Sequence, residues 1–376
     1  MIRVGPYTFH RDTLQTISQL FLDGMRVRFF GIPRLQYKNL LDLAAKVLRQ
    51  NLIDSHMLSA GTGHFKLMWV ADTAMAFGGL RRVFPRKTLR NIIQHIIDAS
   101  VRKGYVTAGF SNRRAIDIPY HRADSLPWLL YMCDQYAQWC KDTRFIKKNR
   151  ASLQTLISAY EKEVIGDDGF VKTNIHGDWA DTIRRPSSSW NNLMAIYTLR
   201  FAKKYHFTLR RIPKNLPSRL LAQRLKRGRL LDYAGSKQPS VDGAILALYL
   251  GLFTKPVRLQ LARFLQHTIR SQRFSPIFAY DKFPKNLETV AARLGAYGYH
   301  TLMSWVHLEL MMINGYKKLG LQHEEGLRRI EALTEKYGNF VETVTQKGEV
   351  FKAIMASEYG FTMSAGQYIE AASDTV

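Results

Sequence analysis

The chain has few cysteines, no long apolar run and no linker-like segment, and each shortage excludes a class of protein. Cys133 and Cys140 stand seven positions apart on one predicted helix, too far for a disulfide along it, and no second cysteine pair indicates a metal site. We therefore expect two reduced thiols in the core. Without a stretch rich in proline, glycine and serine, we expect one domain over residues 1–376, with residues 1–35 as a lead-in.

The apolar segments argue against a membrane protein. The longest, such as Ala244 to Phe253, are too short to span a bilayer. The N-terminal MIRVGPYTFHRD lacks the apolar core of a signal peptide. We expect a cytoplasmic protein with no membrane partner.

Acidic residues are also scarce, with 30 Asp and Glu against 55 Lys and Arg and a net charge of +25. Much of the excess lies between Lys203 and Arg229. A basic footprint is typical of nucleic-acid binders, but no helix-turn-helix, RNP or zinc-finger pattern accompanies it. A solvated basic face or attraction to an acidic polymer is therefore favoured over nucleic acid.

What the chain does contain is apolar periodicity at three and four residues almost throughout, which predicts a mostly helical protein. The expected helices are Tyr37–Leu52, Val70–Val83, Lys87–Lys103, Arg122–Asp142, Phe145–Val164, Ser188–His206, Pro213–Lys226, Val241–Leu252, Pro256–Thr268, Tyr297–Leu319, His323–Tyr337 and Thr362–Ala372.

These helices alternate in character. Every second one, such as SSSWNNLMAIYTL or VDGAILALYLGLF, is aromatic or rich in small residues, whereas most of the others are one-sided, as in RKTLRNIIQHIIDASVRK. A helix that is apolar all round is buried, and a one-sided helix faces water. Six inner helices ringed by six outer ones, an all-α (α/α)6 toroid, is the simplest arrangement.

In such a ring the starts of the inner helices surround one funnel. Asp72, Asp124 and Asp242 stand near three of these starts, where acids also serve as ordinary caps. Trp69, Tyr120 and Trp128 lie beside Asp72 and Asp124, and an aromatic side chain next to a carboxylate is suited to a sugar's apolar face and hydroxyls.

Four segments resemble, in order, the motifs of the six-hairpin glycosidases, which include glucoamylases and the amylo-α-1,6-glucosidase domain of glycogen-debranching enzymes. MWVADTAMAFGGL is similar to W-G-R-D-T and PYHRADSLPWLLYMCDQY to Y-N-S-x-D-A-x-L-W-F-I. HGDWADTIRRPSSSWNNLMAIYTLRFA resembles T-W-M-D…P-R-x-G-x-x-V-E-I-N-A-L-W-Y-N-A-L, and NFVETVTQKGEVFKAIMASEYGFTMSAGQYIEA resembles N-F-Y-E-x-Y-x-P-x-T-G…F-S-W-S-A-x-x-Y-L. The matches span Trp69 to Ala371, and the arginine of W-G-R-D is missing.

The resemblance implies an inverting glycoside hydrolase for an α-linked glucoside or short oligosaccharide, with Asp181 as general acid, Glu342 as general base and no cofactor or metal. Trp69, Asp72, Tyr120, Asp124, Trp128, Trp179 and Asn191 would bind the sugar. Inversion needs two carboxyl groups about 6.5–9.5 Å apart so that a water fits between them. Burial against Trp179 would raise the pKa of Asp181, while Glu342 would stay ionised if it is better solvated or near a cation.

Several alternatives stay open. Asp178 could be the acid in place of Asp181, either could cap an Asx-turn, and Glu342 could be a solvated loop residue. A phosphorylase, a sugar 2-epimerase that relies on histidines, and a non-catalytic glycan-binding toroid would share the fold. His300, His307 and Glu309 are interpreted as core residues, because a histidine on an apolar helix is more often a satisfied core side chain.

Overall fold

The computed structural model describes residues 2–4, 7–9, 22, 24–63, 65–111, 114–116, 122–175, 177–180, 183–233, 235–269, 274, 299–300, 303–352 and 356–373. Two predicted site residues, Tyr120 and Asp181, lie outside these ranges.

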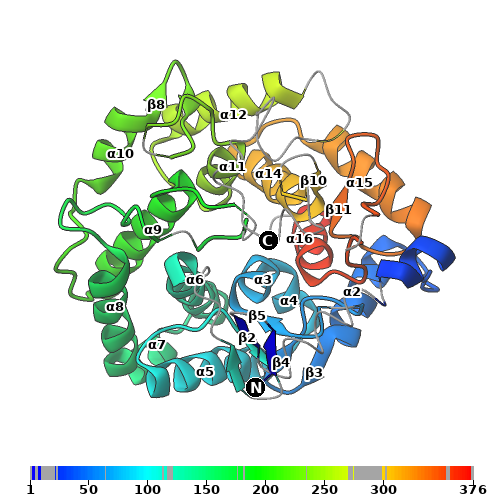
Figure 1. Cartoon of the computed structure of the whole chain (residues 1–376), viewed down its shortest axis with the longest axis horizontal. Coiled ribbons are helices and arrows are strands. Elements are labelled where there is room, and N and C mark those ends of the chain that lie inside the picture. Colours follow the sequence, from blue (N-terminus) through cyan, green and yellow to red (C-terminus); the bar gives the residue numbers. More distant parts are fainter. Residues whose placement is uncertain are drawn as a thin grey trace.

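The helices form two concentric rings (Figure 1). The inner ring consists of α3 (Val70–Met75) with α4 (Phe77–Val83), α6 (Arg122–Cys140), α9 (Ser189–Tyr205), α11 (Val241–Tyr249), α14 (Val306–Leu319) and α16 (Thr362–Ala372). The outer ring consists of α2 (Leu40–Asn51), α5 (Arg86–Lys103), α8 (Arg150–Val164) after the short α7 (Arg144–Lys148), α10 (Leu216–Arg224), α12 (Lys255–Ile269) and α15 (Glu324–Tyr337).

The inner ring is closed, since each of its helices packs on the next and α16 packs on α3 and α4. On the outer helix α5 a single stripe is buried, which includes Leu89, Ile92 and Ile96, whereas every residue of α11 is buried. The predicted alternation and the all-α (α/α)6 toroid are thereby confirmed. The ring closes between distant parts of the chain, because the Asn51 amide of α2 donates to the Gly360 carbonyl, 309 residues later, at 2.7 Å.

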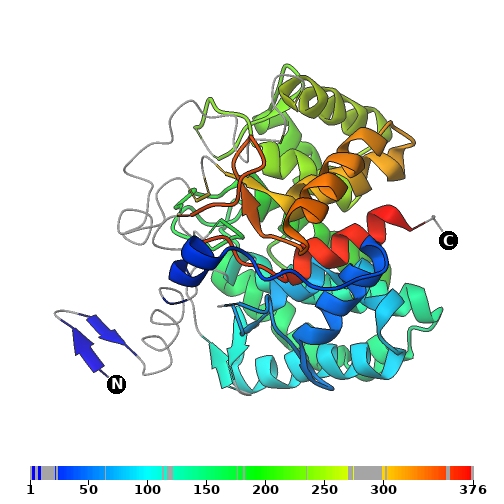
Figure 2. The same cartoon turned by 90° about the vertical axis from the view of Figure 1, so that its right-hand side faces the viewer.

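Short antiparallel strands connect the helices. They are β1 (Ile2–Val4) with β2 (Tyr7–Phe9), β3 (Leu52–Asp54) with β4 (Met57–Leu58), β5 (Met68–Trp69) with β6 (Gly109–Ser111) and β7 (Arg114–Ile116), β8 (Leu225–Lys226) with β9 (Arg229–Leu230), and β10 (Ser304–Trp305) with β11 (Thr343–Val344). Seen from the side, connecting loops coloured green and orange lie at one face of the helical layer, on the left in Figure 2.

Three of the predicted helices differ from the observed ones. The helix expected from Tyr297 begins at Val306, because Ser304 and Trp305 pair with β11 as a strand. Val70–Val83 is divided at Ala76 and Phe145–Val164 at Asn149. Each of the other predicted ranges matches a helix to within a few residues.

Close helix contact depends on glycine at one point of the inner ring. A Cβ at Gly79 of α4 would lie 2.3 Å from the carbonyl oxygen of Gly366 on α16. Elsewhere in the core, Cys133 and Cys140 are free thiols, and Cys133 is buried. Among the described residues, none of the helices is both long and apolar enough to cross a membrane.

Candidate active site

Aromatic side chains from three segments meet at one end of the ring. Trp179, in the loop between α8 and α9, lies edge-on to Trp305 of β10 and to His300, with ring centroids 5.2 and 5.5 Å apart. Tyr299 packs edge-on against Trp305 with centroids 5.0 Å apart. The loop that carries the candidate acid is therefore joined, through these rings, to the start of α14.

Glu342 lies one residue before β11 and is joined to this cluster through the Tyr299 hydroxyl. It is 3% exposed, and the Tyr299 hydroxyl and the Glu358 backbone N–H, the latter at 3.1 Å, both donate to its Oε2. Its position one residue before β11, and the β10–β11 pairing, hold it beside Trp305. The alternative of a solvated loop residue at Glu342 is therefore wrong, because strand pairing and the surrounding rings bury the side chain.

Burial is also the largest influence on the charge of Glu342. It raises the pKa of Glu342 well above its usual value, and the carboxylates of Glu358 and Asp72 raise it further. The hydrogen bonds from Tyr299 and from the Glu358 N–H act in the opposite direction, because they favour the ionised form. Glu342 thus gains its charge only above the usual pH range of a glutamate.

A second, wholly buried charge cluster anchors the Trp179 loop. The Arg185 guanidinium bonds Asp178 at 2.9 Å and both Asp232 and Asp242 at 2.8 Å, and none of the four residues is exposed. The indole N–H of Trp179 donates to Asp242 at 2.9 Å. Arg185 and the first turn of α11 therefore fix the position of the Trp179 ring.

These contacts bear on which aspartate of the loop could be catalytic. Asp178 accepts from the Ala180 N–H through Oδ1 and from Arg185 and Ser188 through Oδ2. Burial raises the pKa of Asp178, whereas Arg185 lowers it. Both oxygens of Asp178 are thus hydrogen-bonded to groups that hold the loop, and Asp181, two positions after Trp179, stays the predicted acid.

Several buried polar atoms near the cluster have no hydrogen-bond partner among the described residues. Both ring nitrogens of His307, the Asn191 amide and the Trp190 indole N–H make no hydrogen bond within the described part of the chain. Trp179 lies 5.9 Å from both the His307 and the Trp190 rings. Burial lowers the pKa of His307 to about 3, so its ring is neutral. Buried groups of this kind normally have partners, and here two of them, in His307 and Trp190, lie next to the same indole.

The other predicted sugar-binding residues lie at varied distances from this centre. Asp72 is in the first turn of α3 and is near enough to influence Glu342. Trp128 is fully buried, and its ring centroid lies 6.3 Å from that of Trp190. Half-buried Trp69 lies on β5 against Gly109, and buried Asp124 on α6 adds to the raised pKa of Tyr160 on the outer helix α8.

Sequence reasoning missed several residues of the centre. Tyr299, Trp305 and His300 were placed within a helix, and the two histidines were interpreted as ordinary core residues. Arg185 gave no signal beyond the pair Arg184-Arg185, because two of its three carboxylate partners, Asp232 and Asp242, lie about fifty residues further along the chain. A search of the described residues finds no group of acids, histidines or cysteines arranged to hold a metal ion.

Comparison with known proteins gives structural relatives only. Neither a family model nor a curated protein sequence matches the chain. The solved GH63 mannosylglycerate hydrolase of Thermus thermophilus, in complex with Tris and D-glycerate, is similar at a TM-score of 0.61 and 12% identity, over 88% of this chain and 99% of that one.

Two further structures agree. A rhamnosidase from Klebsiella oxytoca with rhamnose bound matches at a TM-score of 0.61 and 13% identity, over 90% of this chain and 64% of that one. A wild-type glycosidase matches at 0.64 and 11%, over 97% and 98%. The chain therefore has the (α/α)6 toroid fold of the six-hairpin glycosidases, as its ordered motifs predicted.

Proposed function

We propose that the protein is an inverting glycoside hydrolase that acts on an α-linked glucoside or short oligosaccharide. The observation that carries the proposal is the meeting of two loops at one end of the ring. Trp179 of the α8–α9 loop packs against Trp305, Trp305 packs against Tyr299, and the Tyr299 hydroxyl donates to Glu342 before β11. A carboxylate next to a wall of aromatic rings is suited to a sugar.

In this proposal Asp181 protonates the departing glycosidic oxygen while Glu342 takes a proton from the attacking water. The water attacks the anomeric carbon from the face opposite the leaving group, so the configuration inverts. Glu342 must be ionised to accept the proton, and Tyr299 and the Glu358 N–H favour that form. Since burial raises its pKa, we expect the rate to rise with pH as Glu342 loses its proton.

The buried polar groups of His307, Asn191 and Trp190 support a polyhydroxylated substrate. The nitrogens of His307, the Asn191 amide and the Trp190 N–H offer hydrogen bonds that no described residue takes up. We assign the sugar subsite to Trp69, Asp72, Tyr120, Asp124, Trp128, Trp179 and Asn191. The solved relatives include a mannosylglycerate hydrolase and a rhamnosidase, which supports glycoside hydrolysis and leaves the α-glucoside as our own choice of substrate.

A sugar 2-epimerase is the second candidate, because His300 and His307 lie against Trp179. An epimerase needs a base that removes a carbon-bound proton, and such a base works best when its pKa is near the working pH. Burial lowers the pKa of His307 to about 3, which makes it a weak base. This favours the hydrolase.

The test is product release from a panel of α-linked disaccharides and short glucans, with the anomer of the first product followed by NMR. Wild type should release the β-anomer. Asp181→Asn and Glu342→Gln should each lose about 10²–10⁴-fold in kcat, the usual contribution of a general acid or base. Asp167→Asn and Glu349→Gln, which change exposed acids in the same two loops, should keep wild-type rates.

Other results would redirect the assignment. Retention of the α-anomer would exclude inversion, and turnover that requires inorganic phosphate would indicate a phosphorylase. Conversion of a free sugar to its 2-epimer, lost in His300→Gln, would favour the epimerase. Binding of glycans without turnover of any sugar would favour a non-catalytic toroid.

A further inference from the structure

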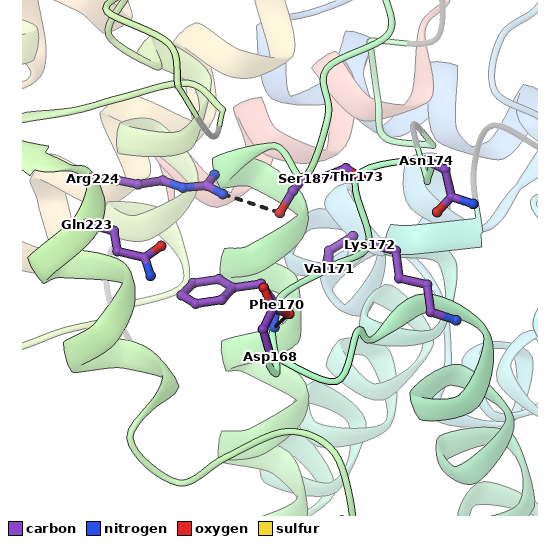
Figure 3. Close-up of a pocket in the computed structure, with 9 residues that line it drawn as sticks. All are labelled: Asp168, Phe170, Val171, Lys172, Thr173, Asn174, Ser187, Gln223 and Arg224. Atoms are coloured by element: carbon purple, nitrogen blue, oxygen red, sulfur yellow. Dashed lines mark hydrogen bonds between the residues drawn. The ribbon is translucent and has the colours of Figure 1, made fainter.

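A pocket of about 360 Å³ lies beside the α8–α9 loop, between that loop and α10. Its lining combines Phe170 and Val171 with polar side chains, and the residues are drawn in Figure 3: Asp168, Phe170, Val171, Lys172, Thr173, Asn174, Ser187, Gln223 and Arg224. A volume of this size is in the range of small-molecule sites. We call it the Arg224 pocket.

Arg224, the last residue of α10, is the buried cation in the lining of this pocket. Its side chain is 3% exposed, and it makes no ion pair with a carboxylate in the part of the chain that the structure describes. Its Nη atoms donate only to the hydroxyls of Ser189 and Ser187, at 3.2 and 3.3 Å, and its Nε–H has no acceptor among the described residues. Burial lowers the pKa of Arg224 to about 10, and the nearby Asp232 carboxylate only partly opposes this effect.

A buried cation that is bonded only to neutral hydroxyls is unusual, because burial of a charge is costly unless it is paired. The contrast within the same region is direct. Arg185 is equally buried, yet it bonds three carboxylates. The nearby carboxylate of Asp232 is bonded to Arg185, so an anion in the adjoining pocket would supply the direct ion pair that Arg224 lacks among the described residues.

The neighbouring side chains hold this arrangement in place. Ser187 has a φ of 49°, a left-handed conformation that is strained for serine, and the Asn192 amide holds it by bonds of 3.0 Å to its carbonyl and hydroxyl. Figure 3 shows Arg224 reaching from α10 to Ser187, with the Phe170 ring below it in this view. The Arg219 guanidinium stacks over Phe170, 5.0 Å from the ring centroid.

The remaining lining residues indicate which groups the rest of the ligand would carry. Lys172 is not a second anchor, since its ammonium bonds the carbonyls of Lys162 and Glu163, and Figure 3 shows it directed away from Arg224. Asp168 accepts the Phe170 N–H through Oδ1, and the side chains of Asn174 and Gln223 are exposed. Together they present donors and acceptors suited to hydroxyl groups.

We propose that the Arg224 pocket binds a small polyhydroxylated anion, a sugar phosphate or a sugar acid, with its phosphate or carboxylate group on the Arg224 guanidinium. Guanidinium groups bind both oxyanions through paired N–H donors. The exposed arginines and lysines that precede and follow α10 in the segment 203–229 would attract such an anion toward this region.

The test is isothermal titration calorimetry at constant ionic strength, with glucose 6-phosphate, gluconate and neutral glucose as probes. Wild type should bind at least one anion about tenfold or more tighter than glucose, which is the range of a charge-assisted hydrogen bond. Whichever of the two anions binds identifies the oxyanion as phosphate or carboxylate. Arg224→Gln should weaken that anion by about tenfold or more.

Since Arg224→Gln changes a buried residue, a second variant tests the pocket from its exposed side. Gln223→Glu places a negative charge on the lining and should weaken the anion by about fivefold or more through repulsion. Ser218→Glu adds the same charge to an exposed part of α10 outside the pocket and should change affinity by less than about twofold.

Glu342→Gln separates this pocket from the candidate active site, and it should leave binding of the anion unchanged. The proposal is overturned if wild type binds neither anion, if Arg224→Gln and Gln223→Glu bind as wild type does, or if binding is lost in Glu342→Gln and kept in Arg224→Gln. None of these results depends on hydrolysis of any glycoside.

Discussion

The buried Arg185 cluster allows a quantitative test of how the Trp179 loop is held. Arg185→Met keeps most of the side-chain volume but removes the only described cation that bonds Asp178, Asp232 and Asp242. Breaking a buried ion pair by removing one partner costs about 3–5 kcal/mol, because the remaining charge stays buried and uncompensated. We expect a loss at the upper end of that range, since three carboxylates are left.

The loss should depend on pH in a defined direction. Burial raises the pKa of Asp178 in the folded protein, and Arg185 opposes this rise. Without Arg185 the pKa of Asp178 goes higher still, so folding stability falls as pH rises from the unfolded-state pKa to that value. The deficit of Arg185→Met relative to wild type should therefore be larger at pH 8 than at pH 5.

The assay is urea denaturation followed by tryptophan fluorescence, with the free energy of unfolding taken from the linear part of the transition. Arg184→Met is the matched control, because Arg184 is exposed, and it should shift stability by no more than about 0.5 kcal/mol. A loss below about 1 kcal/mol for Arg185→Met at pH 8 would refute the argument that Arg185 compensates the three acids.

Other contacts support three further predictions. In Tyr299→Phe the pKa of Glu342 should rise, because a hydrogen bond to its ionised form is lost. The acidic limb of the pH profile of kcat/KM should therefore move to higher pH, and an unchanged limb would contradict this. The pKa of His307 near 3 means that its ring proton shifts should stay constant in NMR spectra from pH 8 to 5, whereas titration near 6.5 would show an exposed ring. Gly79→Ala should cost about 1–3 kcal/mol in urea unfolding by forcing α4 away from Gly366, and wild-type stability would disprove the close contact.

The helical ring was predictable because apolar periodicity is a local signal. In α5 the buried stripe Leu89, Ile92, Ile93 and Ile96 recurs at the period of the helix, and it can be seen without any knowledge of neighbours. The start of α14 was not predictable in the same way. Residues 304–305 become a strand only because β11, some forty positions later, supplies the pairing partner.

The candidate site was likewise predictable only where the signal is local. The aromatic and acidic residues of the Trp179 and Glu342 segments could be found from their motifs, and the ring order placed both loops at one end. The raised pKa of Glu342 could not be predicted from the sequence, since the environment of its carboxyl group depends on Tyr299 and Glu358 from other segments. The structural role of Asp178 likewise becomes visible only once Arg185 folds against it.

The closed ring also affects when the protein can complete its folding during synthesis. Helices α3 and α4 bury one side against α16, the last helix of the ring. The Asn51 amide can form its hydrogen bond only after Gly360, 309 residues later, has been synthesised. During synthesis these early helices leave the ribosome long before their partner exists, with apolar surface exposed meanwhile. Contacts of such long range make folding slow and its intermediates prone to aggregation, so ring closure by the final helix is the step at which a nascent chain would gain most from a chaperone.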